Sequence, residues 1–205
     1  MAIFLLVRAV SDRFVDAAKG DPDLAFSLLD KGLPPPEWHV NAIRDHERRR
    51  DGLVKAGISF DADAAELHDL DRAWDGLKRT LETLGADDAN IFGVGTEVGD
   101  DEEAGIRALT STETSTALTT LERIDRAAVE DAVRKVLHAS RSVGEQRRNP
   151  FTGEMVNVSG GELYGVGSGT DDEIVAWLAD SFDRLRNILR EARDRGFGLA
   201  VQVVL

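Results

Sequence analysis

The stretch from Leu67 to Leu84, LHDLDRAWDGLKRTLETL, carries apolar residues at spacings of 3, 4, 3, 4 and 3. This period matches one face of an α-helix and does not fit the alternation of a strand. It predicts one amphipathic helix with Trp74 in the middle of the apolar stripe and charged residues close around it. Such an indole is either an anchor of the core with a solvated rim or the wall of a binding site.

Both ends of the chain have the composition of buried strands. Ile3 to Val7 is uniformly apolar, and Leu199 to Leu205 has almost no polar interruption, as expected of strands covered on both faces. We expect both in one central sheet packed by several amphipathic helices, which defines a helix-rich α+β domain. The residues expected to be largely buried are Trp74, Trp177, Leu178, Leu185, Val201 and Val203.

Capping signals place further helices. T-x-x-E boxes at Thr110 and Thr170 each begin a helix, and Gly196 ends the second one, since a Thr and a Glu three residues later satisfy exposed backbone N–H groups. Ser11 is expected to cap a short helix near the N-terminus. Asp61 or Asp63 is expected to cap the Trp74 helix.

The 205 residues suit a single domain. An insertion at about 34–61 reads as a polar excursion with a short helix near Val40 to Arg50. A long loop is expected at about 140–169, where Asn149-Pro150 and Thr152-Gly153 suggest a turn or a small hairpin.

The chain is acidic and contains no cysteine. Its 25 basic and 38 acidic residues give a formal charge of −13, which disfavours nucleic acid and anionic membranes and suits a basic protein partner. The absence of cysteine excludes disulfides and thiolate chemistry. The N-terminus has no signal-peptide pattern and no apolar run is long enough to span a membrane, so we expect a cytoplasmic protein.

LDRAWDGLKRTL, the acidic loop that follows it, GIRALT at 105–110 and the last helix and strand occur in a recognisable order. Together they resemble the YfbM-like family of bacterial proteins of unknown function, best from about residue 60 to the C-terminus. The family pattern L-D-K-x-W-x-x-L-H corresponds here to Leu70, Asp71, Arg72, Trp74, Leu77 and Lys78. The resemblance implies a fold and supplies no reaction.

Family members usually carry a tyrosine before the last helix, and Tyr164 is the candidate here. Lys78 occupies the position of the usual histidine, so imidazole chemistry does not transfer. Gly165 replaces the usual proline after the tyrosine.

No complete catalytic or metal-binding motif is present. His39 and His46 lack a third ligand at a convincing spacing, and there is no H-E-x-x-H motif. The glycine run before Thr170 lacks a phosphate-binding lysine. The acidic cluster from Asp61 to Asp71 fails the spacing of a calcium loop and fits helix-start carboxylates instead. We therefore assign no catalytic residue, metal or cofactor.

The remaining candidate is a polar pocket around Trp74. Asp71 and Lys78 lie on the same predicted helix, and Arg107 and Tyr164 would complete a site for a small anionic or amide ligand if the fold brings them together. The alternative is that Trp74 belongs to the core. Arg107 is either a clamp that pins the acidic loop against the Trp74 helix or a ligand anchor.

Two functions follow from these observations. The first is a non-catalytic binding protein, of accessory or immunity type, whose acidic surface meets a basic protein partner. The second is a small enzyme or ligand-binding domain that uses Asp71, Trp74, Lys78, Arg107 and Tyr164. The oligomeric state stays open.

Overall fold

The two ends of the chain pair with each other at the centre of a sheet. In the computed structural model, which describes residues 4–29, 40–70, 73–98, 105–142, 145–148, 155–158 and 169–204, strand β1 (Phe4–Val10) runs antiparallel to β7 (Gly198–Val204). Their pairing extends from Phe4 opposite Val204 to Val10 opposite Gly198. The prediction that both terminal strands lie in one central sheet is confirmed.

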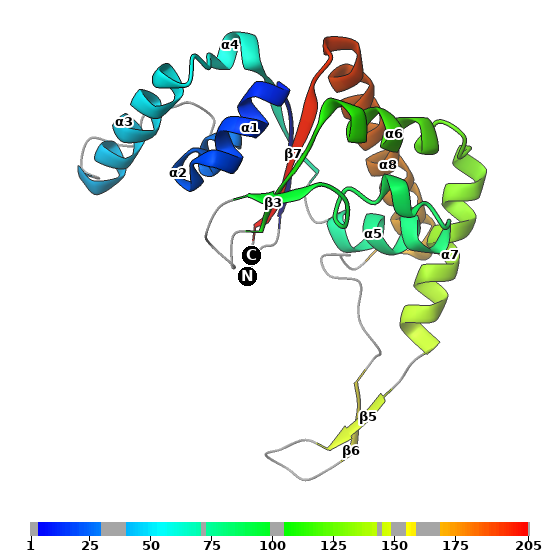
Figure 1. Cartoon of the computed structure of the whole chain (residues 1–205). Coiled ribbons are helices and arrows are strands. Elements are labelled where there is room, and N and C mark those ends of the chain that lie inside the picture. The colour runs from blue at the N-terminus through cyan, green and yellow to red at the C-terminus, as the bar shows by residue number, and fades with distance from the viewer. Residues whose placement is uncertain are drawn as a thin grey trace.

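Three further strands complete this antiparallel sheet, in the order β2-β1-β7-β4-β3. They are β2 (Ala64–Asp69), β4 (Ile106–Leu109) and β3 (Thr96–Val98). The short strands β5 (Glu145–Arg148) and β6 (Met155–Val158) form a separate antiparallel hairpin that projects from the helical body (Figure 1).

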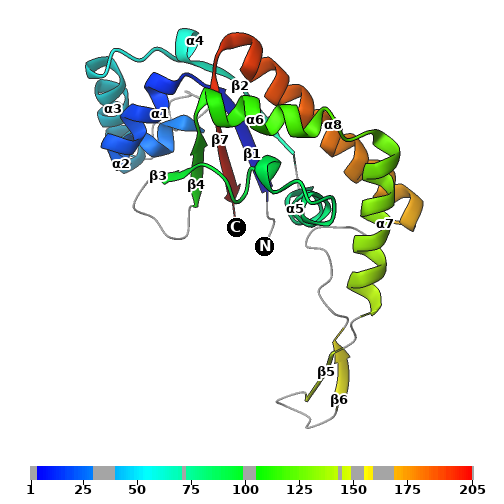
Figure 2. The same ribbon diagram turned by 45° about the vertical axis from the view of Figure 1, so that its right-hand side comes forward.

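Helices cover both faces of the sheet, so the strands alternate between two cores (Figure 2). Leu5, Val7 and Val201 belong to the larger core. It also contains residues of α5 (Trp74–Thr83), η3 (Asp87–Ala89), α6 (Ser111–Leu121), α7 (Arg126–Ser142) and α8 (Asp171–Arg195). The smaller core lies under α1 (Asp12–Gly20), α2 (Pro22–Ala25), η1 (Phe26–Leu28) and α3 (Val40–Lys55). The α+β prediction is therefore confirmed.

Capping groups fix the helix ends as the sequence predicts. Thr110 and Thr170 each form a complete capping box, with Glu113 and Glu173 respectively, and Gly196 ends α8 in the left-handed conformation at φ 66°. The hydrogen bond from the backbone N–H of Thr170 lowers the pKa of Glu173, because it stabilises the ionised carboxylate.

A second cap joins the two helical layers. Asp12, the first residue of α1, accepts hydrogen bonds from the backbone N–H of Ser111 at 2.7 Å and from its hydroxyl at 2.6 Å. One carboxylate thereby satisfies the start of α6 from the other side of the sheet.

The prediction of one helix from Leu67 to Leu84 is wrong in its first half. Leu67 lies on β2 opposite Arg8, and the α-helix begins only at Trp74. Pairing with β1 decides the conformation here, and a single spacing of three between Leu67 and Leu70 cannot distinguish a helix from a strand end. Asp61 and Asp63 cannot cap this helix, because they lie on a separate short helix, α4 (Phe60–Asp63), that precedes β2.

Burial follows the predicted pattern except at Trp74, Trp177 and Val203. Leu178, Leu185 and Val201 are buried. Trp74, Trp177 and Val203 are only partly buried and pack against the rim of the larger core. Of the described helices, none has the length and apolar character needed to cross a membrane.

Gly198 provides a test of the sheet. A methyl group at this position would lie 2.0 Å from the carbonyl oxygen of Leu109, so Gly198→Ala must force β7 away from the end of β4. We expect the free energy of unfolding to fall by about 1–3 kcal/mol in urea titrations. The control is Gly20→Ala, where the added methyl meets nothing within 4 Å. Equal losses in the two variants would contradict the close approach.

Candidate functional site

Of the five residues predicted to form a site at Trp74, Trp74 itself included, the structure describes three. Trp74 begins α5 and Lys78 follows one turn later, half-buried, whereas Arg107 lies on β4. Asp71 and Tyr164 lie outside the described residues. Asp75, on the same helix as Lys78, is buried and paired with Arg79 at 3.0 Å. A ligand site around Trp74 therefore stays a prediction.

Arg107 contacts one carbonyl oxygen and one carboxylate, as a clamp would, but both belong to residues outside the Trp74 helix. Its Nη1 donates to the carbonyl oxygen of Gly93 at 3.4 Å, and its Nη2 lies 3.8 Å from the carboxylate of Glu97, its cross-strand neighbour on β3. Gly93 lies just before β3 and Glu97 lies on it, so the two contacts join β3 and the segment before it to β4. The clamp thus acts along this edge of the sheet.

The clamp predicts that Arg107→Lys lowers the free energy of unfolding, since one ammonium cannot reach both oxygens. The loss should be below about 1 kcal/mol, because the pair is partly exposed and such pairs are weak. Arg123→Lys is the control, because Arg123 is exposed and has no ion-pair partner in the described chain. Chemical denaturation of both variants measures the difference, and an unchanged Arg107→Lys protein would argue against the clamp.

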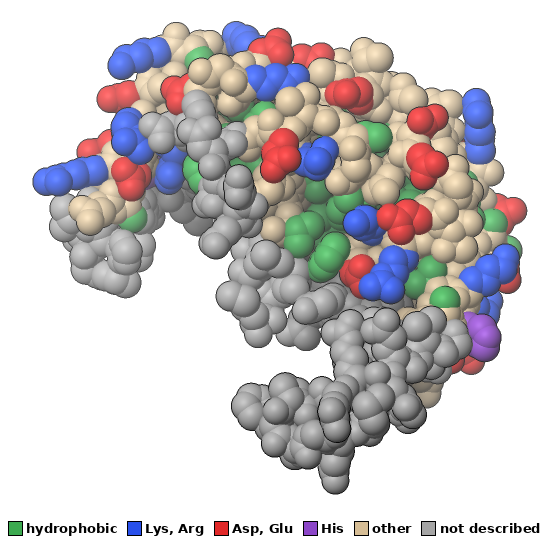
Figure 3. Space-filling model, turned by 60° about the horizontal axis from the view of Figure 1, so that its bottom comes forward, with side chains coloured by type: hydrophobic (Ala, Val, Ile, Leu, Met, Phe, Trp, Pro, Cys, Tyr) green, Lys and Arg blue, Asp and Glu red, His purple; other side chains and the backbone are tan. Residues whose placement is uncertain are grey.

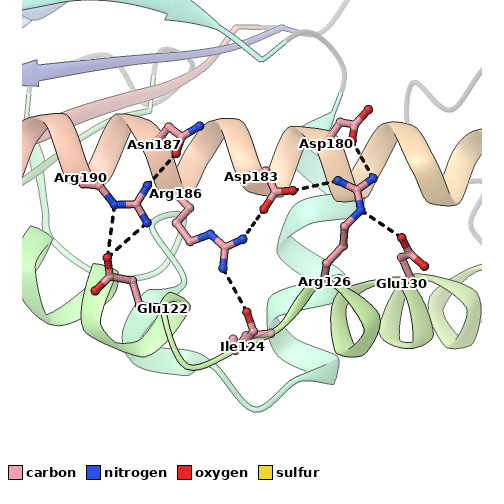
Figure 4. Close-up of polar contacts among 9 residues, drawn as sticks. All are labelled: Glu122, Ile124, Arg126, Glu130, Asp180, Asp183, Arg186, Asn187 and Arg190. Atoms are coloured by element: carbon pink, nitrogen blue, oxygen red, sulfur yellow. Dashed lines mark hydrogen bonds and ion pairs between the residues drawn. The ribbon is translucent and has the colours of Figure 1, made fainter.

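An ion-pair network ties the corner between α6 and α7 to α8 (Figure 4). Arg126 contacts three carboxylates at once: Asp180 at 2.7 Å, Asp183 at 2.9 Å and Glu130 at 3.1 Å. The hydrogen bonds to Asp180 and Glu130 raise the pKa of Arg126. Arg126 and Glu130 lie on α7, and Asp180 and Asp183 lie on α8, so these contacts join the two helices.

The same network continues along α8. Arg186 donates to the carbonyl oxygen of Ile124 at 3.1 Å and pairs with Asp183, and Arg190 contacts Glu122 at 3.3 Å. The charged groups are mostly half-exposed, so each pair contributes little to stability alone. Sequence reasoning missed this network, although the charges recur at helical spacing on the polar face of α8.

A β-bulge opens a pocket at the free edge of β2. Arg8 pairs with Leu67 and Val10 pairs with Ala64, so Ala65 and Glu66 together face Ala9. A pocket of about 520 Å³ lies at this bulge. We call it the bulge pocket; its lining residues are Arg8, Phe60, Asp61, Ala64, Ala65, Glu66 and Arg195. Bulges commonly redirect side chains in this way at functional edges.

The two arginines of the bulge pocket already have partners. Arg8 is buried; its Nε donates to the carbonyl oxygen of Ala65 at 2.9 Å, and its guanidinium lies 5.3 Å from the centre of the Phe60 ring. A buried charge requires such hydrogen bonds. Arg195 stacks over Phe197 at 4.8 Å and lies 3.7 Å from Glu191.

The two carboxylates of the bulge pocket are uncompensated. Asp61 and Glu66 are exposed, and neither forms an ion pair or a side-chain hydrogen bond within the described chain. The described lining therefore holds two carboxylates without a partner beside two guanidinium groups that have partners. The helix-start interpretation of this acidic cluster holds for Asp61 on α4, but Glu66 lies on β2.

Asp63 fixes the wall of the bulge pocket to the rest of the fold. Its carboxylate accepts from the hydroxyl of Ser11 at 2.7 Å, from Arg13 at 2.7 Å and from the backbone N–H of Ser59 at 2.9 Å. Burial alone would raise the pKa of Asp63, but the hydrogen bonds from Ser59, Arg13 and Ser11 outweigh it and lower the pKa. The side chain thus anchors α4, which carries Phe60 and Asp61.

Asp63→Asn should remove a pH-dependent part of the stability. A lowered folded-state pKa stabilises the protein above the unfolded value of about 3.9 and ceases to do so as the pH falls through the folded value. We expect a loss of about 1–3 kcal/mol at neutral pH, shrinking as the pH falls to about 3. Urea titrations across this range measure it. Asp61→Asn, two positions away and exposed, should show no such trend; a pH-independent Asp63→Asn loss would contradict the assignment.

Comparison with known proteins gives one structural match. The structure is similar to that of YfbM from Escherichia coli, described as a protein of unknown function, with 11% sequence identity, 98% coverage of this chain, 99% coverage of that chain and a TM-score of 0.49. YfbM gives its name to the family that the sequence resembles. No protein-family profile matches the sequence, and no curated protein matches it. The bulge pocket is therefore interpreted from its own chemistry.

Proposed function

We propose that this chain is a non-catalytic cytoplasmic binding protein, of accessory or immunity type, that receives a basic protein partner. The observation that carries the proposal is the pair of uncompensated carboxylates, Asp61 and Glu66, at an accessible pocket. The formal charge of −13 supports it, since long-range attraction raises the rate at which a basic partner is encountered.

Net charge alone does not locate the binding surface. In Figure 3 basic and acidic side chains are interspersed over the visible face, and hydrophobic side chains gather near its centre. A local group of unpaired charges therefore identifies a contact point better than the overall balance does.

The lining of the bulge pocket favours recognition over chemistry. Two guanidinium groups, two carboxylates and one aromatic ring recognise charge and shape, and the described residues of the lining include no serine, histidine or cysteine to act as nucleophile or imidazole base.

Affinity capture from native lysate tests the proposal. Protein immobilised at low ionic strength should retain basic proteins and release them as salt approaches about 0.5 M, because screening weakens exposed charge pairs. A chain of similar size and lower net charge is the control. Recovery of no partner at low salt would contradict the proposal, because electrostatic association is strongest there.

A small-ligand site around Trp74 is the second candidate. Lys78 favours it, being half-buried beside Trp74 with no ion-pair partner in the described chain. A thermal-shift screen of anionic and amide metabolites tests this candidate, since a ligand that binds the native state raises its melting temperature. Lys78→Gln should abolish the shift, and a shift that persists in this variant would exclude the Trp74 site.

A further inference from the structure

Among the strands that the structure describes, β2 lies at the edge of the sheet and pairs with β1 alone. Edge strands expose backbone donors and acceptors that can pair with another chain. The end of β2 is occupied, because Arg184 donates to the carbonyl oxygen of Asp69 at 2.8 Å. The start of β2 is occupied as well, because the N–H of Ala64 donates to the carbonyl oxygen of Phe60 and the carbonyl oxygen of Ala65 accepts from Arg8. The segment available for pairing therefore runs from Glu66 to about His68.

The charges on β2 select what can pair with it. Glu66 and Asp69 are both exposed, so edge-to-edge pairing of two copies would bring carboxylates together, which is unfavourable. An extended segment rich in Lys or Arg would instead bring cations beside these carboxylates, which is favourable. The same acidic residues thus oppose self-association and favour a basic strand.

The bulge pocket lies beside this edge and can receive a side chain of the added strand. Ala64, Ala65 and Glu66 belong both to β2 and to the lining of the pocket. Asp61 and Glu66 supply the unpaired negative charge, while Arg8 and Arg195 already contact other groups. A cationic side chain placed there would gain two carboxylates.

We propose that an extended cationic segment of a partner protein adds to the free edge of β2 as a further strand and places one Lys or Arg side chain in the bulge pocket. This inference rests on the proposed function and specifies the site and the mode of binding. Backbone hydrogen bonds supply affinity in strand addition, and pockets for alternate side chains supply specificity.

The probe is a capped hexapeptide of alternating threonine and lysine, since alternation places all its lysines on one side of an extended strand. Fluorescence anisotropy at about 50 mM salt measures its affinity. We expect the double variant Asp61→Asn with Glu66→Gln to bind about tenfold more weakly. The matched control is Glu82→Gln with Asp88→Asn, which removes the same charge from exposed residues elsewhere.

Two peptide variants test the mode of binding. Replacing lysine by glutamine should abolish binding. N-methylation of alternate residues should abolish it in the frame whose N–H groups face β2 and spare it in the other frame, because only one set of amides pairs with an added strand.

The inference is overturned if the lysine peptide does not bind, if both double variants weaken binding equally, or if both N-methylated frames bind as well as the parent. It is separable from the proposed function. A partner captured from lysate and retained equally by the wild type and both double variants would leave the proposed function standing and refute the β2 site.

Discussion

The pairing of β1 with β7 is the constraint on which the rest of the fold depends. These strands are the second and third of five, so both of their edges and both of their faces are used. Such strands must be apolar throughout, and the residues that alternate along them contribute to two separate cores. The helices on each side pack because this pair presents an apolar surface to both.

Arg8 on β1 and Gln202 on β7 are the polar residues of this central pair, and the bulge explains Arg8. The bulge removes Ala65 from regular pairing with β1. The guanidinium of Arg8 donates a hydrogen bond to the Ala65 carbonyl oxygen in its place. A charge inside the sheet is therefore supported by the same irregularity that opens the pocket. The ion pairs along α8 join this helix to α7 and to the segment between α6 and α7.

The sequence predicts those elements whose signals are local. The terminal strands are apolar runs, and both T-x-x-E boxes satisfy their own helix starts. Sequence reasoning does not predict the strands β3 and β4. They have only three and four residues, and they form because β4 pairs with β7 and β3 pairs with β4. Sequence reasoning also fails at Leu67, because leucines at the boundary of a strand and a helix can continue the period of the helix that follows.

The bulge pocket could be predicted only in part. An arginine inside the otherwise apolar strand FLLVRAV indicates a buried charge that needs partners. Nothing local shows that Arg8, Asp61 and Arg195 converge, since they come from three elements far apart in the chain. Trp74, by contrast, attracts attention by size and periodicity, yet it packs at the rim of the core.

The antiparallel pairing of β1 and β7 also places Phe4 and Val204, the first and last described residues, side by side at one end of the sheet (Figure 1). The bulge lies at the opposite end of β1, next to Val10. A strand rises about 3.3 Å per residue, so the length of β1 separates Phe4 from the bulge by roughly 20 Å. A tether, a fused domain or a solid support joined to the chain beyond Phe4 or Val204 would thus be attached at the end of the sheet that lies away from the bulge.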